Sequence, residues 1–437
     1  MQVDKTTLAD LSIFHSEEEQ SVFHHLNYTQ TNDGREYLRY LLANPLHSVA
    51  DILDTQQTIQ QLMNVDKEWP VTVSNGTIMV MERFYETQIN SFPAHPNEVN
   101  SRFYKFMNGP DYSLLRYTVE HAIDFTKGLQ QIVNILQEQK LSKQLAAWTA
   151  RMAMLLIKPM IQEIVVADKK QLTSVEVLTY GGFIRHHFKN QCFELIDLYS
   201  KLDAYMSIAW ASKKHGFTFP EITQSTEPYI KATGLYHMLL ETPVTYDIEL
   251  SVANNFLFLT GANMAGKSTF IKAVGVSAYL AHLGIGVPAK EMKLSFFDGL
   301  LSNIQVVDNI VKGESFFFNE VQRIKNTIEK ISDGKNWLIL IDELFKGTNQ
   351  KDAVKCSTTV IEGLRKTKNA LFVLSTHLYE IGDDLRKYPN IQFHYFETSV
   401  KDDQLLFSYQ LKEGISNDRL GYLILRKEGV VDLLEKL

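Results

Sequence analysis

A glycine-containing turn between an apolar strand and a helix is the feature that most constrains this fold. Residues 256–275 read FLFLTGANMAGKSTFIKAVG, and residues 261–268 within them fit the pattern G-x-x-x-x-G-K-[ST]. Glycines in such a loop let backbone N–H groups approach phosphate oxygens, and the following helix presents its positive end to them. The alternative is a chance match in a strand-turn-helix, and the required strand before the loop and helix after it count against that alternative. The expected phosphate-binding residues are Gly261, Ala262, Asn263, Met264, Ala265, Gly266, Lys267, Ser268 and Thr269.

Two carboxylates at the end of a second apolar strand, WLILIDE at 337–343, extend this interpretation. In P-loop NTPases the loop lysine, here Lys267, reaches the β- and γ-phosphates, while Ser268 and Asp342 hold Mg²⁺. Glu343 can then polarise the attacking water as general base. Alone, an Asp-Glu pair would more often be an ordinary strand end. Behind a phosphate-binding loop it predicts Mg²⁺-dependent hydrolysis of ATP to ADP and phosphate.

Two further positions are candidates. His377 follows the apolar strand ALFVLS at 370–375, where it can sense or position the hydrolytic water, although a lone histidine is usually structural. The stretch GESFFFNEVQRIKNTIEKI predicts an amphipathic helix that begins around Ser315. Ser315 could be the N-cap of this helix. A serine beside a glycine at a helix start is also how ABC-like ATPases complete a neighbour's nucleotide site, and both roles can hold together.

The chain divides into two halves with different periodicity. Residues 1–232 carry apolar positions at helical spacing, with long amphipathic helices expected within 111–139 and 193–216. Residues 233–437 alternate short apolar strands with helices, which predicts a mostly parallel sheet flanked by helices. The stretch between them, near 216–234, is punctuated by Pro220, Pro228 and Gly234. We therefore predict an α/β P-loop NTPase domain preceded by a mostly α-helical domain.

Net charge, cysteine content and apolar runs restrict the class of protein and the cellular compartment that we expect. The net charge of −7 argues against a generally basic nucleic-acid binder, and two distant cysteines indicate neither a disulfide framework nor a zinc site. The most apolar run, LAAWTARMAMLLIKPMI, is interrupted by Arg151, Lys158 and Pro159, so we expect a buried helix rather than a membrane span. The N-terminus does not read as a signal peptide. We expect a cytoplasmic protein.

The motifs together resemble those of the MutS family of DNA mismatch repair ATPases. TGANMAGKST, GIGVPA, GESFFFNEVQ, DELFKGTN and STH occur in the order and spacing of its ATPase domain. LNYTQTNDGREYLRYLLANPLHSVADILDTQQTIQQL resembles its core domain, and KLDAYMSIAWASKKHGFTFPEI its returning lever helix. The resemblance implies a core and lever domain at 1–232 and an ABC-type ATPase domain at 233–437. It also implies ATP and Mg²⁺, DNA as partner, and a homodimer in which Ser315 acts on the other chain's nucleotide.

The sequence also departs from the family pattern. Ala262 replaces the usual proline of the loop, Phe345 and Lys346 alter the stretch after the two carboxylates, and Gln305 stands at a usual glycine. A mismatch-reading domain with its Phe-x-Glu wedge should precede the core domain, and we do not expect one because the core resemblance begins almost at Met1. RFYE at 83–86 falls in the core region and should contribute Phe84 to packing. The first half also reads as too short for a full DNA clamp. We further expect no C-terminal dimerisation extension.

The sequence is compatible with two functional interpretations. The first is a dimeric, nucleotide-switched ATPase that acts in DNA repair or recombination on branched or unusual DNA rather than on single mismatches. The second is a nucleotide-switched clamp on RNA, ribosomes or a protein. FIRHHFK at 183–189 is the best basic and aromatic cluster for nucleic acid, with a solvated helix face as the alternative. The chain has neither the LSGGQ-type sequence of transporter ATPases nor an Asn-Lys-x-Asp base-reading motif of GTPases.

Overall fold

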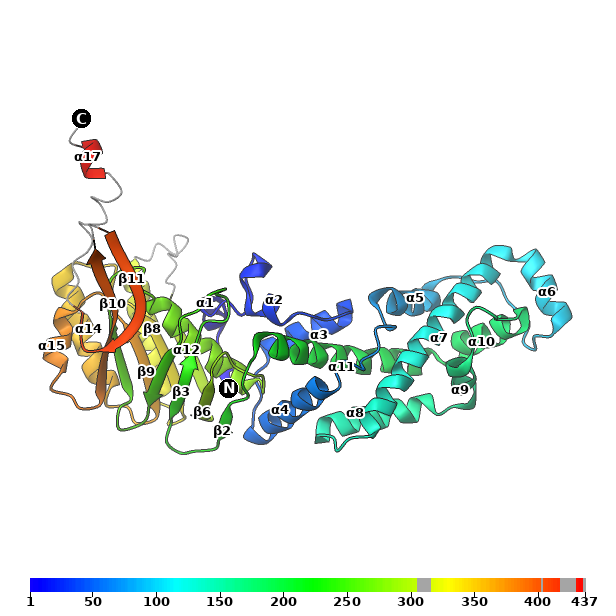
Figure 1. The fold of residues 1–437 in the computed structure, drawn as a ribbon, viewed down its shortest axis with the longest axis horizontal. Helices are drawn as coiled ribbons and strands as arrows, with labels where there is room; N and C mark the ends of the chain where they lie inside the picture. Colours follow the sequence, from blue (N-terminus) through cyan, green and yellow to red (C-terminus); the bar gives the residue numbers. More distant parts are fainter. Residues whose placement is uncertain (305–315, 402–403, 417–429, 435–437) are drawn as a thin grey trace. The chain divides into compact units, whose positions relative to one another are not determined.

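The computed structural model describes residues 1–304, 316–401, 404–416 and 430–434, which form two compact units (Figure 1). The helical unit comprises Leu26–Ala43 and Leu53–Lys214, and the sheet unit comprises Met1–His25, Asn44–Ile52 and His215–Leu437. The predicted order, a helical region followed by an α/β domain, is confirmed. Within the described residues, none of the helices combines the length and the apolar character that crossing a membrane requires.

The helical unit is built around α7, whose buried face is largely apolar. Leu115, Val119, Leu129 and Ile132 of α7 are fully buried, and helices α5, α8, α9 and α10 pack against it. The helices are α3 (Asn32–Ala43), α4 (Val49–Asn64), α5 (Asn75–Glu86), α6 (Glu98–Met107), α7 (Gly109–Gln137), α8 (Lys143–Leu156), α9 (Pro159–Val166), α10 (Ser174–His187) and α11 (Lys189–His215).

Two local expectations in this unit can be compared with the structure. The apolar run at 145–161, expected as one buried helix, forms most of α8 and the start of α9, because Pro159 occupies the first turn of a new helix. The run is only partly buried, since Met154 and Ile157 are 64% and 73% exposed. RFYE lies in α5, where Phe84 is 1% exposed. The packing role expected for Phe84 is confirmed.

A buried carboxylate organises the start of α3. Asp203 of α11 accepts hydrogen bonds from the backbone N–H groups of Gln30 and Thr31 and from the Thr31 hydroxyl, at 2.7–3.0 Å. Gly34 lies directly over this carboxylate, and a Cβ at position 34 would come within 2.2 Å of an Asp203 oxygen. The first turn of α3 is thus fixed by a side chain about 170 residues away in the sequence.

The sheet unit contains a seven-stranded sheet in the order β1-β7-β8-β9-β5-β10-β11. Neighbouring strands are parallel except for the antiparallel pair β10 and β11, so the predicted mostly parallel sheet is confirmed. The strands are β1 (Gln2–Val3), β7 (Gly299–Asn303), β8 (Trp337–Asp342), β9 (Ala370–Ser375), β5 (Phe256–Thr260), β10 (Ile391–Lys401) and β11 (Gln404–Glu413). A second sheet, which the sequence did not predict, has the order β2-β6-β3-β4: β2 (Glu221–Thr223), β6 (Glu291–Ser295), β3 (Ile230–Leu235) and β4 (Tyr246–Leu250).

Helices cover both faces of the large sheet, which is why β5, β8 and β9 are buried at every residue. Ile339 of β8 joins a core with residues of α13, α14 and α15, while α12 packs on the other face, where Gly275 comes close to Leu340. The helices are α1 (Lys5–Asp10), α2 (Val22–Leu26), α12 (Lys267–His282), α13 (Phe316–Ile331), α14 (Gln350–Leu364), α15 (Glu380–Leu385) and α17 (Val430–Leu434), with a 3-10 helix at Glu18–Gln20. The helix expected from Ser315 is α13; Ser315 itself lies outside the described residues.

The N-terminal segment corrects the predicted domain boundaries. Residues 1–25 and 44–52, assigned from the sequence to the helical domain, belong to the sheet unit, and the last segment of this unit begins at His215 rather than near residue 232. Gln2 and Val3 add a parallel strand beside β7, and the backbone N–H groups of Ser302 and Ile304 donate to the side chains of Thr7 and Asp10. The pairing of strands about 300 residues apart in the sequence places the N-terminal segment in the sheet unit. The local periodicity of the sequence does not indicate this pairing.

Candidate nucleotide-binding site

The loop between β5 and α12 has the backbone that its glycines predict. Gly261 and Gly266 adopt positive φ angles of 137° and 109°, in a region that disfavours residues with a Cβ. A Cβ at Gly261 would also approach the backbone of Phe396 to 3.2 Å. Met264, with φ 70°, occupies the left-handed region as well and is 78% exposed. The loop therefore bends sharply around the first turn of α12.

Lys267 lies inside the curve of this loop. Its Nζ donates to the carbonyl oxygens of Gly261 at 2.7 Å and Ala262 at 3.0 Å, and the residue is 5% exposed. Burial lowers the pKa of Lys267, and the nearby carboxylates of Glu343 and Asp342 oppose that shift. An ammonium group enclosed in this way is positioned to meet anionic oxygens that enter the loop.

Asp342 ends β8 directly below the loop. Its two carboxylate oxygens accept from the hydroxyls of Ser268 and Ser375, the first at 2.5 Å. Asp342 and Ser375 are paired residues of neighbouring parallel strands, so the sheet register brings them together. The hydroxyl and carboxylate oxygens of Ser268 and Asp342 are the hard ligands that Mg²⁺ prefers, in the small number that a phosphate-bound ion needs. The residues present fit the ion.

Glu343 follows in a left-handed conformation with φ 64°, and its backbone N–H donates to Ser375 O at 3.0 Å. Its carboxylate lies 3.0 Å from Lys346 Nζ and 3.7 Å from His377 Nδ1. His377 therefore lies beside the carboxylate of Glu343, which we predicted from the sequence to be the general base, although the two residues follow different strands. The imidazole is about half exposed, whereas the Glu343 side chain is 17% exposed.

Lys267, Ser268, Asp342 and Glu343 line a pocket of about 700 Å³ together with residues that the sequence did not single out. Its lining is made of two groups: Asn263, Met264, Gly266, Lys267, Ser268, Thr269, Asp342, Glu343 and Lys346 from the loop, the start of α12 and the end of β8, and Leu240, Thr242, Val244, Tyr246 and Tyr409 from other segments. Tyr246 is held edge-on against Phe270, with ring centroids 5.3 Å apart. The second group is largely apolar and aromatic, a surface suited to a planar base.

The missed residues come from segments far from the loop. Tyr246 begins β4 and Tyr409 lies in β11 with φ 53°. For Tyr246 the sequence offers one signal: the stretch YHMLLETPVTYDIEL at 236–250 resembles the segment that leads into the ATPase sheet of the MutS family. Lys346 was noted only as a departure from the family pattern, yet it lines the pocket and pairs with Glu343.

The basic and aromatic cluster at 183–189 lies at the junction of α10 and α11. The Arg185 guanidinium donates to the carbonyl oxygens of Phe84 and of Thr87, the latter at 2.8 Å, and so caps the end of α5. Phe188 is 1% exposed. These contacts favour a structural role for Arg185 and Phe188, and the nucleic-acid reading of the cluster stays a prediction.

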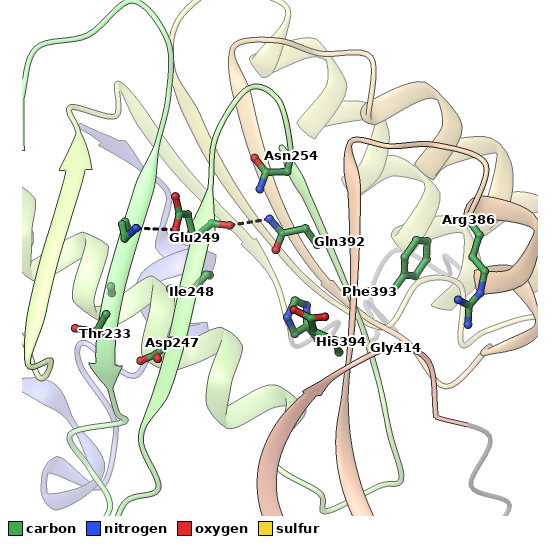
Figure 2. A pocket seen from close by; sticks show the side chains of 13 residues that line it. Thr233, Asp247, Ile248, Glu249, Asn254, Arg386, Gln392, Phe393, His394 and Gly414 are labelled. Carbon is green, nitrogen blue, oxygen red and sulfur yellow. Dashed lines mark hydrogen bonds and ion pairs between the residues drawn. The ribbon is translucent and has the colours of Figure 1, made fainter.

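A second hollow of the sheet unit, of about 670 Å³, lies beside β3, β4 and β10 (Figure 2). Its lysine and its arginine are each already paired with a carboxylate: Lys231 pairs with Glu249 at 2.8 Å, and Arg386 pairs with Asp383 at 3.2 Å. Figure 2 shows the Gln392 amide bonded to the Glu249 backbone across it. None of the predicted site residues lines this hollow, so the loop pocket is the better candidate site.

Comparison with known proteins finds similarity to MutS proteins. Residues 257–432 match MutS domain V. DNA mismatch repair protein MutS of Petrotoga mobilis is 26% identical over 283 residues, which cover 63% of this chain and 34% of that protein. The MutS proteins of Aquifex pyrophilus and Shouchella clausii are 29% and 30% identical, each over 53% of this chain and 27% of the relative. The chain spans about a third or less of the length of these relatives.

Proposed function

Because the chain belongs to the MutS family, we propose that it is a Mg²⁺-dependent ATPase of the P-loop type. The observation that carries the proposal is the convergence of Lys267, Ser268, Asp342, Glu343 and His377 on one pocket or its rim, from three neighbouring strands and one helix. Parallel strands present their carboxyl ends at one edge of a sheet, where such folds bind ligands.

Nucleotide binding follows from the loop. Backbone N–H groups of residues 261–269 and the start of α12 offer hydrogen bonds to the phosphates, and Lys267 adds a positive charge. Ser268 and Asp342 would hold Mg²⁺, which neutralises charge on the β- and γ-phosphates. The apolar and aromatic lining residues, among them Val244 and Tyr246, suit the adenine base.

Hydrolysis needs a group that accepts a proton from the attacking water. Glu343 is the carboxylate positioned for it: the water oxygen attacks the γ-phosphorus, its proton moves to Glu343, and the bond to the bridging oxygen of ADP breaks. His377 lies beside Glu343 and can orient the water, and Lys346 holds the carboxylate in place. The products are ADP and inorganic phosphate.

The wider role follows from the relatives, which are named as DNA mismatch repair proteins. We propose that this ATPase acts on DNA in repair or recombination, with branched or unusual DNA as its preferred structure. ATP would favour a dimer through the ATPase domain, in which Ser315 of each chain approaches the other chain's γ-phosphate. Ser315 lies outside the described residues, so its part in the proposal depends on the sequence motif alone.

The test compares wild type with Glu343→Gln, using Glu329→Gln on the exposed side of α13 as the matched control. We expect Glu343→Gln to bind ATP normally and to lose about 10²-fold in kcat, because the general base is gone while the phosphate loop is intact. EDTA should abolish turnover of the wild type. Equal turnover in wild type and Glu343→Gln would remove Glu343 from this role.

The DNA proposal is tested separately by fluorescence anisotropy with branched DNA, paired duplex and RNA, with and without ATP. Binding through phosphates should weaken steeply as salt rises. We expect branched DNA to bind more tightly than duplex or RNA. Tighter binding of RNA, or no binding of any of the three, would count against the DNA role while leaving the ATPase proposal intact.

A further inference from the structure

A buried carboxylate of α13 is bonded to the loop that follows Glu343. Glu320 is 5% exposed, and its two oxygens accept from the backbone N–H groups of Lys346 at 3.0 Å and Gly347 at 3.2 Å. An ionised carboxylate accepts hydrogen bonds at both oxygens, and bonds to a charged acceptor are stronger than neutral ones. The side chain therefore grips two successive peptide groups.

Packing joins the same two segments. The rings of Phe317 in α13 and Phe345 in the loop lie 5.7 Å apart, and Phe345 is 4% exposed. Gly347 passes so close to the helix that a Cβ there would lie 2.7 Å from the Phe316 ring and 2.8 Å from the Phe317 backbone nitrogen. The start of α13 and residues 345–347 thus form one packed block.

The loop needs such support because its backbone is unfavourable. Glu343 and Phe345 both have left-handed φ angles, 64° and 58°, which residues with a Cβ adopt only when their surroundings impose them. Lys346 lies between the two restraints: Glu320 holds its backbone N–H, and its own Nζ holds the Glu343 carboxylate at 3.0 Å. A continuous chain of contacts leads from α13 to the candidate base.

We propose that Glu320 is a positioning residue that locks residues 345–347 to α13 and, through Lys346, orients Glu343 for hydrolysis. The inference rests on the proposed ATPase function. If Glu320 has this role, the position of α13 determines the rate of hydrolysis. A shift of this helix moves the backbone N–H groups that bind Glu320, and the Glu343 carboxylate moves with them. Nucleotide binding, which depends on the loop at 261–269, is left unchanged.

The test is Glu320→Gln, with Glu329→Gln on the same helix as the control. Glutamine keeps the length of the side chain but has one acceptor oxygen, and its NH₂ group faces an N–H that it cannot satisfy. We expect kcat to fall roughly 10- to 100-fold, the effect of displacing a catalytic group by about 1 Å. The Kd for ATP should stay within about two-fold of wild type. Glu329→Gln should match wild type in both.

A double variant separates positioning from general damage. If Glu320 acts through Glu343, adding Glu320→Gln to Glu343→Gln should lower the residual kcat by less than about two-fold. Gly347→Ala, which pushes the loop from the helix while the Glu320 side chain itself is kept, should reproduce the loss of kcat at unchanged ATP affinity. Wild-type kcat in Glu320→Gln, a matching loss of ATP affinity, or a full additive loss in the double variant would overturn the inference. A Glu343→Gln variant that turns over normally would instead overturn the proposed function.

Discussion

Two buried histidines should make the sheet unit lose stability in mild acid. His282 is fully buried, its Nδ1 lies 2.7 Å from Ala278 O, and its Nε2 accepts from the Phe297 N–H at 2.8 Å. Because Phe297 must donate to Nε2, the imidazole is neutral and carries its proton on Nδ1. Burial lowers the pKa of His282 to about 3. His237, 8% exposed, has its pKa lowered to about 4 by burial and by the charges of Lys272 and His25.

The sign and size of the effect follow from linkage. A histidine whose pKa is lower in the folded state binds a proton more tightly when unfolded, so its stabilising contribution is present above about pH 6.5 and is lost as pH falls. Each pH unit below that value costs about 1.4 kcal/mol per histidine until the folded pKa is reached. Between pH 7 and pH 5 each should cost about 2 kcal/mol, and the pair about 4 kcal/mol. That is a large share of a typical folding free energy of about 5–15 kcal/mol.

The two cysteines allow each unit to be followed separately. Cys192 is buried in the helical unit and Cys356 is half-buried in the sheet unit, so pulsed labelling with a methanethiosulfonate along a urea series reports both transitions by mass spectrometry. We expect the Cys356 transition to lose about 4 kcal/mol between pH 7 and pH 5 in wild type, and about 2 kcal/mol less in His282→Gln. Glutamine can still accept from Phe297 but does not titrate.

The comparison between variants removes the contribution of carboxylates, which titrate equally in both proteins. The Cys192 transition is the internal control, because His282 lies in the other unit. If His282→Gln kept the full pH dependence of wild type, the buried neutral state of His282 would be refuted. A Cys356 transition that moved by less than about 0.5 kcal/mol between pH 7 and pH 5 would refute the argument for both histidines.

Two further outcomes are expected. Gly34→Ala should lower the free energy of the unfolding transition at Cys192 by about 1–3 kcal/mol, since its Cβ would meet the Asp203 carboxylate at 2.2 Å. The transition at Cys356 should stay unchanged. If neither transition changed, the close packing at Gly34 would be contradicted. Mixtures of Lys267→Ala and Ser315→Arg chains should partly regain the ATPase activity that each variant has lost alone, because a mixed dimer holds one site with an intact Lys267 and an intact Ser315. Action of Ser315 across a dimer would be excluded if the mixture stayed inactive and the chains sedimented as monomers at saturating ATP.

Much of the candidate site could be predicted from the sequence because its parts are local. A loop that binds phosphate must lie between a strand and a helix and must have glycines where φ is positive, so 256–275 contains the whole pattern in consecutive residues. Asp342, Glu343 and His377 were predicted for a related reason: each follows a buried apolar strand, and parallel strands end at a common edge. Periodicity likewise indicated α7 and α11.

Only the tertiary structure decided which distant segments complete these parts. The strand at Gln2–Val3 has no apolar pattern that distinguishes it from a helix, and pairing with β7 alone places it in the sheet. Tyr246 and Tyr409 reach the pocket from strands whose sequences carry no phosphate motif. Glu320 reads as one polar position of an amphipathic helix, yet its carboxylate is buried against Lys346 and Gly347. Hydrogen bonds and packing between residues far apart in the chain determine where these segments lie. The periodicity of the sequence cannot indicate such contacts, because it depends only on residues that are neighbours along the backbone.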